Sequence, residues 1–108
     1  MNSIIQGNTE YCPICFKKIE GQGNWHHIYP GSANRKKSEE DGMKIYVHPE
    51  CHMFIHNSPL LLLDLQARYQ KKWCEYYDKS VNDFIKRYGK NYDVRLDEFR
   101  KKEWRDME

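Results

Sequence analysis

A chain of 108 residues has the length of one small domain, and we expect residues 1–108 to form a single domain. Charged residues make up 31% of it and hydrophobic residues 39%, so the apolar core is thin. A core of this kind usually needs another source of stability, such as a bound structural metal. The net charge of +2 is mildly basic, and no stretch approaches the roughly 20 apolar residues that cross a membrane. These features exclude a membrane-spanning protein. Because the first residues also lack a secretion signal, we expect the chain to reside in the reducing cytoplasm.

The segment 11–57 holds all five histidines and three of the four cysteines. It follows ten mostly polar residues that we expect to be frayed. Its glycine, proline and alternating apolar positions predict five elements in sequence. These are a turn, a strand, a polar loop, a second strand and a short helix, over residues 11–16, 25–29, 31–42, 43–47 and from Pro49.

Residues 58–108 change to a helical pattern. Ser58 and Pro59 are an N-cap and a first helical residue, and apolar positions three and four apart predict a helix to about residue 78. A capping pattern of Ser80 with Asp83, and Gly89 as a stop, bound a second helix over 81–88. The residues from 93 onward are strongly charged, with apolar positions that would suit a third amphipathic helix.

Four residues have the spacing of a structural zinc site. Cys12 and Cys15 form a C-x2-C pair, and His48 and Cys51 repeat the two-residue gap after a predicted strand. Thiolate and imidazole both suit tetrahedral Zn²⁺. An alternative set closes the site with Cys51 and either His52 or His56, which leaves His48 free.

The remaining histidines suit a second ion. His52 and His56 are four residues apart on a predicted helix, so both imidazoles point to one side. His26 and His27 are adjacent on a predicted strand and point to opposite faces, so only one of them can join that ion. The other is then free to face a substrate.

This combination of motifs resembles the HNH endonucleases, particularly the small zinc-containing proteins of phages and prophages. The resemblance covers residues 11–57 well and 58–92 loosely, and it includes the stretch 26–34 and the run 89–92. It implies an α+β fold with a small ββα-metal finger (His-Me finger) and a structural zinc knuckle over 11–57. Two or three C-terminal helices would follow, in a helical extension over 58–92 and a charged tail over 93–108.

The resemblance also implies a role for each site residue. His27 would be the general base that activates water, and Asn34 would brace the loop that holds it. A divalent ion (Mg²⁺, Mn²⁺, Ni²⁺ or Zn²⁺) would be bound by His26, His52 and His56, beside a structural zinc on Cys12, Cys15, His48 and Cys51. The implied reaction is single-metal phosphodiester hydrolysis that leaves 5′-phosphate and 3′-hydroxyl ends.

Nucleic acid is the expected partner, with DNA favoured over RNA. The basic run Arg35-Lys36-Lys37 is predicted to contact backbone phosphates near the site. Two other classes of function remain open at this point. One is a non-catalytic zinc module that binds nucleic acid or protein, and the other is a phage assembly protein that docks through an aromatic stripe of Tyr69, Trp73 and Tyr77.

Overall fold

Two short strands and five helices make up the regular structure of residues 2–107, the part of the chain that the computed structural model describes. The predicted α+β class is therefore confirmed. The chain divides between Ser58 and Pro59 into two compact units, which we call the N-terminal and C-terminal units. This boundary coincides with the start of the predicted helical extension. Within the described residues, every helix is too short or too polar to span a membrane.

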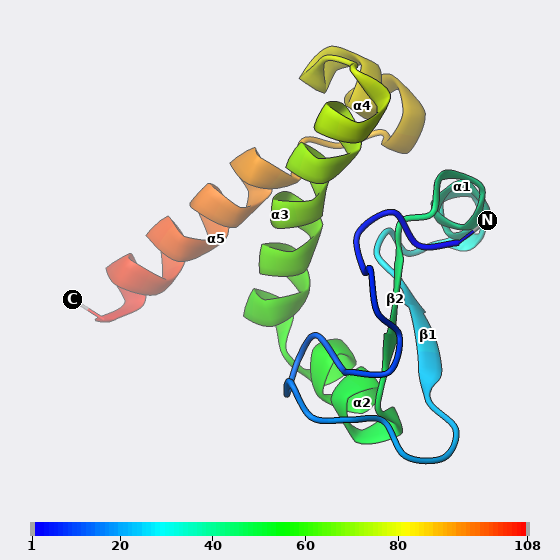
Figure 1. Ribbon diagram of the computed structural model, residues 1–108. Coiled ribbons are helices and arrows are strands. Elements are labelled where there is room, and N and C mark those ends of the chain that lie inside the picture. The colour runs from blue at the N-terminus through cyan, green and yellow to red at the C-terminus, as the bar shows by residue number, and fades with distance from the viewer. Residues whose placement is uncertain (1, 108) are drawn as a thin grey trace. The chain divides into compact units, whose positions relative to one another are not determined.

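The N-terminal unit is built on a two-stranded antiparallel sheet (Figure 1). Strand β1 (Asn24–His27) pairs with β2 (Lys44–Val47), and the register places His27 opposite Lys44. Helix α1 (Ser32–Asp41) connects the two strands, and α2 (Pro49–Asn57) follows β2. Both helices contact β1. The core is made of fully buried side chains, namely Ile28, Tyr29, Met43, Ile45, Val47 and Ile55.

Helix α1 corrects a prediction, because residues 31–42 were expected to be a loop. Its sequence is almost wholly polar and lacks an apolar stripe, which is the usual signal for a helix that packs on a sheet. Polar contacts dock it instead. The buried hydroxyl of Ser38 accepts a hydrogen bond from the backbone N–H of Tyr29 at 3.2 Å, and the carboxylate of Glu39 reaches Lys44 of β2 at 2.8 Å.

Gly42 ends α1 in the left-handed conformation, with φ of +74°. A Cβ atom at this position would lie 2.5 Å from the carbonyl oxygen of Asn2 and 2.9 Å from a methyl carbon of Ile4. We therefore expect Gly42→Ala to destabilise the N-terminal unit by more than the roughly 1–2 kcal/mol of left-handed strain. Chemical denaturation measures the loss. Gly21→Ala is the control, because Gly21 has φ of +83° and no atom near its Cβ position. That variant should be destabilised by the left-handed strain alone.

The C-terminal unit consists of α3 (Pro59–Tyr77), α4 (Val81–Tyr88) and α5 (Tyr92–Met107). The first two helices match their predicted ranges closely. The capping box of Ser80 and Asp83 is present, and Gly89 ends α4 in the left-handed conformation. The charged tail predicted from residue 93 is a helix for most of its length. Leu96 in that helix is buried, whereas Trp104 is exposed.

Aromatic rings and one buried amide hold these three helices together. Trp73 lies against Phe84 and Tyr88, with ring centroids 5.4 and 6.3 Å apart. The side chain of Gln70 is buried on α3, and its oxygen accepts a hydrogen bond from the backbone N–H of Tyr92 at 2.8 Å. Because Trp73 is 3% exposed, it is a core residue and is unavailable as part of an aromatic docking stripe.

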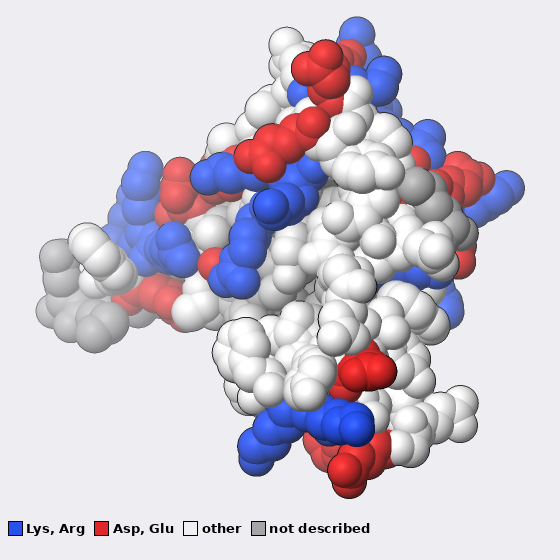
Figure 2. All heavy atoms as spheres, in the orientation of Figure 1, with Lys and Arg blue, Asp and Glu red and all other residues white. Residues whose placement is uncertain are grey.

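Lys and Arg lie interspersed with Asp and Glu on the face of the molecule drawn in Figure 2. This distribution agrees with the small net charge of +2, so any polyanion site has to be sought in local geometry.

Candidate metal centres

Three cysteines and one histidine converge in the N-terminal unit. The ligand atoms of Cys12, Cys15, His48 and Cys51 all lie within 4.8 Å of one another. The Sγ atom of Cys15 and the Nδ1 atom of His48 are 3.3 Å apart. Ligands bound tetrahedrally to one zinc ion lie about 3.3–3.8 Å apart, so this cluster could hold a structural metal such as zinc.

Two pieces of local structure present these four ligands. The turn that carries the first two is closed by hydrogen bonds from Cys12 N–H to the Lys17 carbonyl at 2.9 Å and from Phe16 N–H to the Cys12 carbonyl at 2.8 Å. Phe16 has the left-handed φ of 64° that this turn requires. The other two ligands lie at the start of α2, where His48 is the N-cap and Pro49 is the first helical residue.

The ring of His48 is oriented for metal binding through Nδ1. Its Nε2 atom lies 3.1 Å from the carbonyl oxygen of Lys18, which accepts only, so Nε2 carries the hydrogen. The lone pair is then on Nδ1, the atom that faces Cys15. An outer partner of this kind commonly fixes the tautomer of a metal-bound histidine. The structure thus groups His48 with the cysteines, and it does not adopt the alternative in which His52 or His56 closes this cluster.

The thiols of this cluster need a cation in order to ionise together. Burial disfavours the Cys12 thiolate, but the backbone N–H groups of Cys15, His48 and Ile14 together with the His48 side chain outweigh it and lower the pKa of Cys12 to about 6. For Cys51, burial and the neighbouring Cys12 and Cys15 raise the pKa to about 12. The positive charge of a divalent ion offsets this mutual repulsion, so thiols that coordinate a metal are deprotonated.

The second cluster consists of His26, His52 and His56, whose ligand nitrogens also lie within 4.8 Å of one another. The two Nε2 atoms of His52 and His56 are 3.0 Å apart, as expected for imidazoles on one face of α2. The ring centroid of His26 lies 5.3 Å from that of each partner. His26 points toward α2 because it lies on the face of β1 opposite to His27.

The donor set of this second cluster fits a divalent ion. The Nε2 atom of His26 is buried and has no hydrogen-bond partner within the described residues. Burial, and then repulsion from His52 and His56, lowers the pKa of His26 to about 3, so its ring is neutral at pH 7. A buried nitrogen without a partner is unfavourable by about 1–3 kcal/mol, and coordination of an ion would satisfy it.

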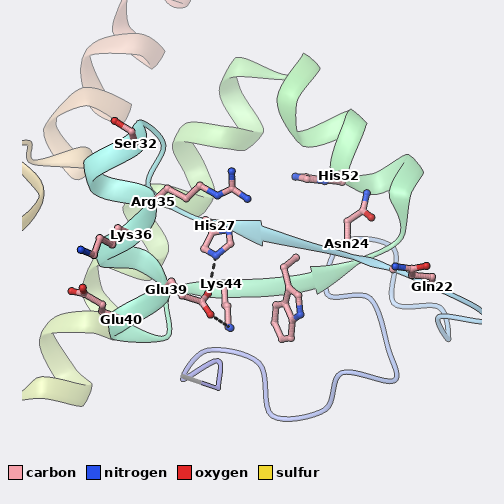
Figure 3. Close-up of a pocket in the computed structure, with 12 residues that line it drawn as sticks. Gln22, Asn24, His27, Ser32, Arg35, Lys36, Glu39, Glu40, Lys44 and His52 are labelled. Atoms are coloured by element: carbon pink, nitrogen blue, oxygen red, sulfur yellow. Dashed lines mark hydrogen bonds and ion pairs between the residues drawn. The ribbon is translucent and has the colours of Figure 1, made fainter.

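His27 occupies the other face of β1 and meets α1 (Figure 3). Its Nε2 atom lies 2.8 Å from Oε2 of Glu39, and Oε1 of Glu39 lies 2.8 Å from the Nζ atom of Lys44. Hydrogen bonds from Lys44 first and His27 second hold the pKa of Glu39 at about 2. Glu39 could not be recognised from the sequence, because it lies in the segment predicted as a loop and no spacing links it to His27.

Two adjoining hollows expose these histidines. A pocket of about 220 Å³ is lined by all four of His26, His27, His52 and His56, together with Arg35. An open groove of about 1000 Å³ extends from His27 and His52 along α1. Arg35 lines both hollows.

The remaining predicted site residues lie on α1 with different surroundings. Lys36 lines the groove, and Figure 3 draws it with Arg35 on the same helix. Asn34 and Lys37 line neither of these two hollows. Since residues 32–41 are helical, the loop that Asn34 was expected to brace does not form, and its role stays a prediction.

Comparison of the chain with protein-family models, with curated proteins and with solved structures finds no match.

Proposed function

We propose that this chain is a metal-dependent endonuclease that hydrolyses phosphodiester bonds, with DNA as the favoured substrate. Its N-terminal unit would be a ββα-metal finger in which α1 replaces the connecting loop. The observation that carries the proposal is the pocket of about 220 Å³ in which three converging imidazoles meet a fourth that contacts a carboxylate. This arrangement supports one group of ligands for an ion and one separate base.

His27 is the residue suited to accept a proton from water. Histidine is the side chain that most often serves as a general base near neutral pH. Its ring nitrogens are not part of the three-histidine cluster, and it lines the same pocket. A water molecule in that pocket would lie within reach of His27 and beside the three ligands.

His26, His52 and His56 are the residues that would hold the ion. A divalent metal bound there supplies a Lewis acid that stabilises negative charge on the phosphoryl and leaving oxygens. Three imidazoles accept Zn²⁺ and Ni²⁺ readily, whereas Mg²⁺ prefers oxygen ligands and retains its waters. His26 is buried and His56 is exposed, so the open side of the cluster faces solvent and substrate.

Arg35 and Lys36 suit the binding of a phosphate backbone. Both line the groove that extends from His27, and Arg35 also lines the smaller pocket. Contacts of this kind give affinity that depends on salt and carry no sequence information. A non-catalytic zinc module, in contrast, would use the Cys12, Cys15, His48 and Cys51 cluster and would need no second group of histidines.

A plasmid nicking assay tests the proposed activity. The protein is incubated with supercoiled DNA and Mg²⁺, Mn²⁺, Ni²⁺ or Zn²⁺ in turn. We expect open-circular product with at least one of these ions and none in the presence of EDTA. DNA ligase should reseal the nicks, because the implied ends are 5′-phosphate and 3′-hydroxyl. Supercoiled DNA that stays intact with every ion would favour the non-catalytic zinc module.

A further inference from the structure

We infer that Glu39 is a positioning residue for His27, whose carboxylate fixes the imidazole through Nε2 and leaves Nδ1 as the proton acceptor. This inference rests on the proposed role of His27 as the base. Glu39 meets the proposed base directly, through its contact with His27. Its effect on the reaction would therefore pass through the ring that it holds.

The geometry favours one fixed arrangement of the carboxylate. His27 and Lys44 are direct partners in the register of β1 and β2, so their side chains emerge side by side. Glu39 reaches down from α1 and gives one oxygen to each, at 2.8 Å in both cases (Figure 3). With both oxygens engaged, the carboxylate cannot rotate away from His27 without losing a charged partner.

The chemistry of the contact determines the tautomer of His27. An ionised carboxylate accepts hydrogen bonds and donates none, so the Nε2 atom of His27 must carry the hydrogen. In the neutral ring the lone pair is then on Nδ1. When Nδ1 takes a proton from water, the ring becomes an imidazolium ion. The negative charge of Glu39 stabilises that ion, and Glu39 itself keeps no proton.

Lys44 completes the arrangement on the other side of Glu39. It is buried, with an exposed fraction of 7%, and its Nζ atom also lies 4.6 Å from the centroid of the Trp25 ring. Its positive charge keeps the carboxylate ionised, as a partner of His27 has to be. His27, Glu39 and Lys44 therefore form one continuous line of contacts, and all three line the groove along α1.

A purely structural role for Glu39 is the competing explanation. The carboxylate links α1 to β2 and contributes to docking of that helix. However, α1 is also held by Ser38, whose hydroxyl bonds the backbone of Tyr29, and by Gly42 at its C-terminus. Loss of the charge at position 39 should therefore leave α1 in place while it weakens the contacts with His27 and Lys44.

Glu39→Gln tests the proposal by kinetics, with Glu20→Gln as the control. Glu20 is an exposed acidic residue of the N-terminal unit that lines neither hollow. With plasmid DNA and Mn²⁺, we expect Glu39→Gln to lower kcat by about 10- to 100-fold at unchanged KM and metal content, with the fold retained by circular dichroism. Glu20→Gln should stay within about two-fold of the wild type. An unchanged kcat in Glu39→Gln would overturn the proposal, and so would an equal loss in both variants.

The tautomer of His27 tests the same proposal without any activity measurement. Long-range ¹H–¹⁵N NMR correlations of the wild-type ring should report hydrogen on Nε2, and Glu39→Gln should report a mixture of tautomers. Hydrogen on Nδ1 in the wild type would overturn the proposal whatever the nuclease result. If the wild type holds the Nε2–H tautomer through Glu39 but cleaves no DNA, the positioning stands and the nuclease assignment fails.

Discussion

Replacing Cys12 by Ser is expected to remove zinc from the Cys12, Cys15, His48 and Cys51 cluster and to unfold the N-terminal unit. Cys12 is buried, with an exposed fraction of 1%, and its turn carries the ligand pair of residues 12 and 15. Binding of a structural zinc contributes about 10–16 kcal/mol of apparent free energy, which is comparable to or larger than the net stability of a small domain. Zinc content and circular dichroism of Cys12→Ser measure the two losses.

Cys74→Ser is the control for this variant. Cys74 is the one cysteine outside the cluster, and it lies half-buried on α3 in the C-terminal unit. Its variant should keep its zinc and the fold of the N-terminal unit. A Cys12→Ser protein that melts cooperatively at the wild-type temperature without zinc would refute the structural role of the ion.

Replacing His27 by Ala is expected to lower the rate of DNA cleavage by about 10²- to 10⁴-fold, which is the usual contribution of a general base. The three-histidine cluster excludes His27, so the variant should bind the same number of metal ions as the wild type. Its Glu39 and Lys44 remain paired, so α1 should stay docked. Nicking rates at saturating DNA, together with metal analysis, check both parts.

His52→Ala gives the contrasting pattern, because His52 belongs to the three-histidine cluster. That variant should lose both the cleavage activity and the exchangeable ion. Full activity in His27→Ala at equal metal content would remove His27 as the base and leave the ligand assignment intact.

Local sequence patterns predicted most of the grouping of these cysteines and histidines, but they left open whether His48 or a later histidine joins the cysteines. The two-residue gaps of Cys12 with Cys15 and of His48 with Cys51 set the local geometry of each pair, and the structure brings both pairs together. The four-residue gap of His52 and His56 placed both rings on one side of α2. Because side chains alternate between the two faces of a strand, the sequence placed His26 and His27 on opposite faces of β1. In each case the spacing itself fixes the direction of the side chain.

Helix α1 and the partner of His27 could not be found in this way. Residues 32–41 lack an apolar period, so the helix depends on contacts with residues outside it. Ser38 meets Tyr29, and Glu39 meets His27 and Lys44. These contacts depend on the register of β1 and β2, which sequence periodicity does not specify.

In the C-terminal unit, the helix limits were predictable and several side-chain positions were not. Ser80, Asp83 and Gly89 bound α4 through local hydrogen bonds and a left-handed cap, which are properties of the residues themselves. Apolar character did not predict burial there, because Trp104 is 74% exposed and Val81 is 42% exposed. Val81 is the first residue of α4, which places its side chain at the edge of the packed face.

Metal analysis per chain tests the central claim most directly, namely that the N-terminal unit contains two separate ion sites. We predict one tightly held zinc that survives dialysis against a mild chelator and one ion that exchanges. His48→Ala should lose the tight zinc, and His52→Ala should lose only the exchangeable ion, because the two residues belong to different clusters. A wild-type protein that binds a single ion in total, or loss of the same ion in both variants, would contradict the account.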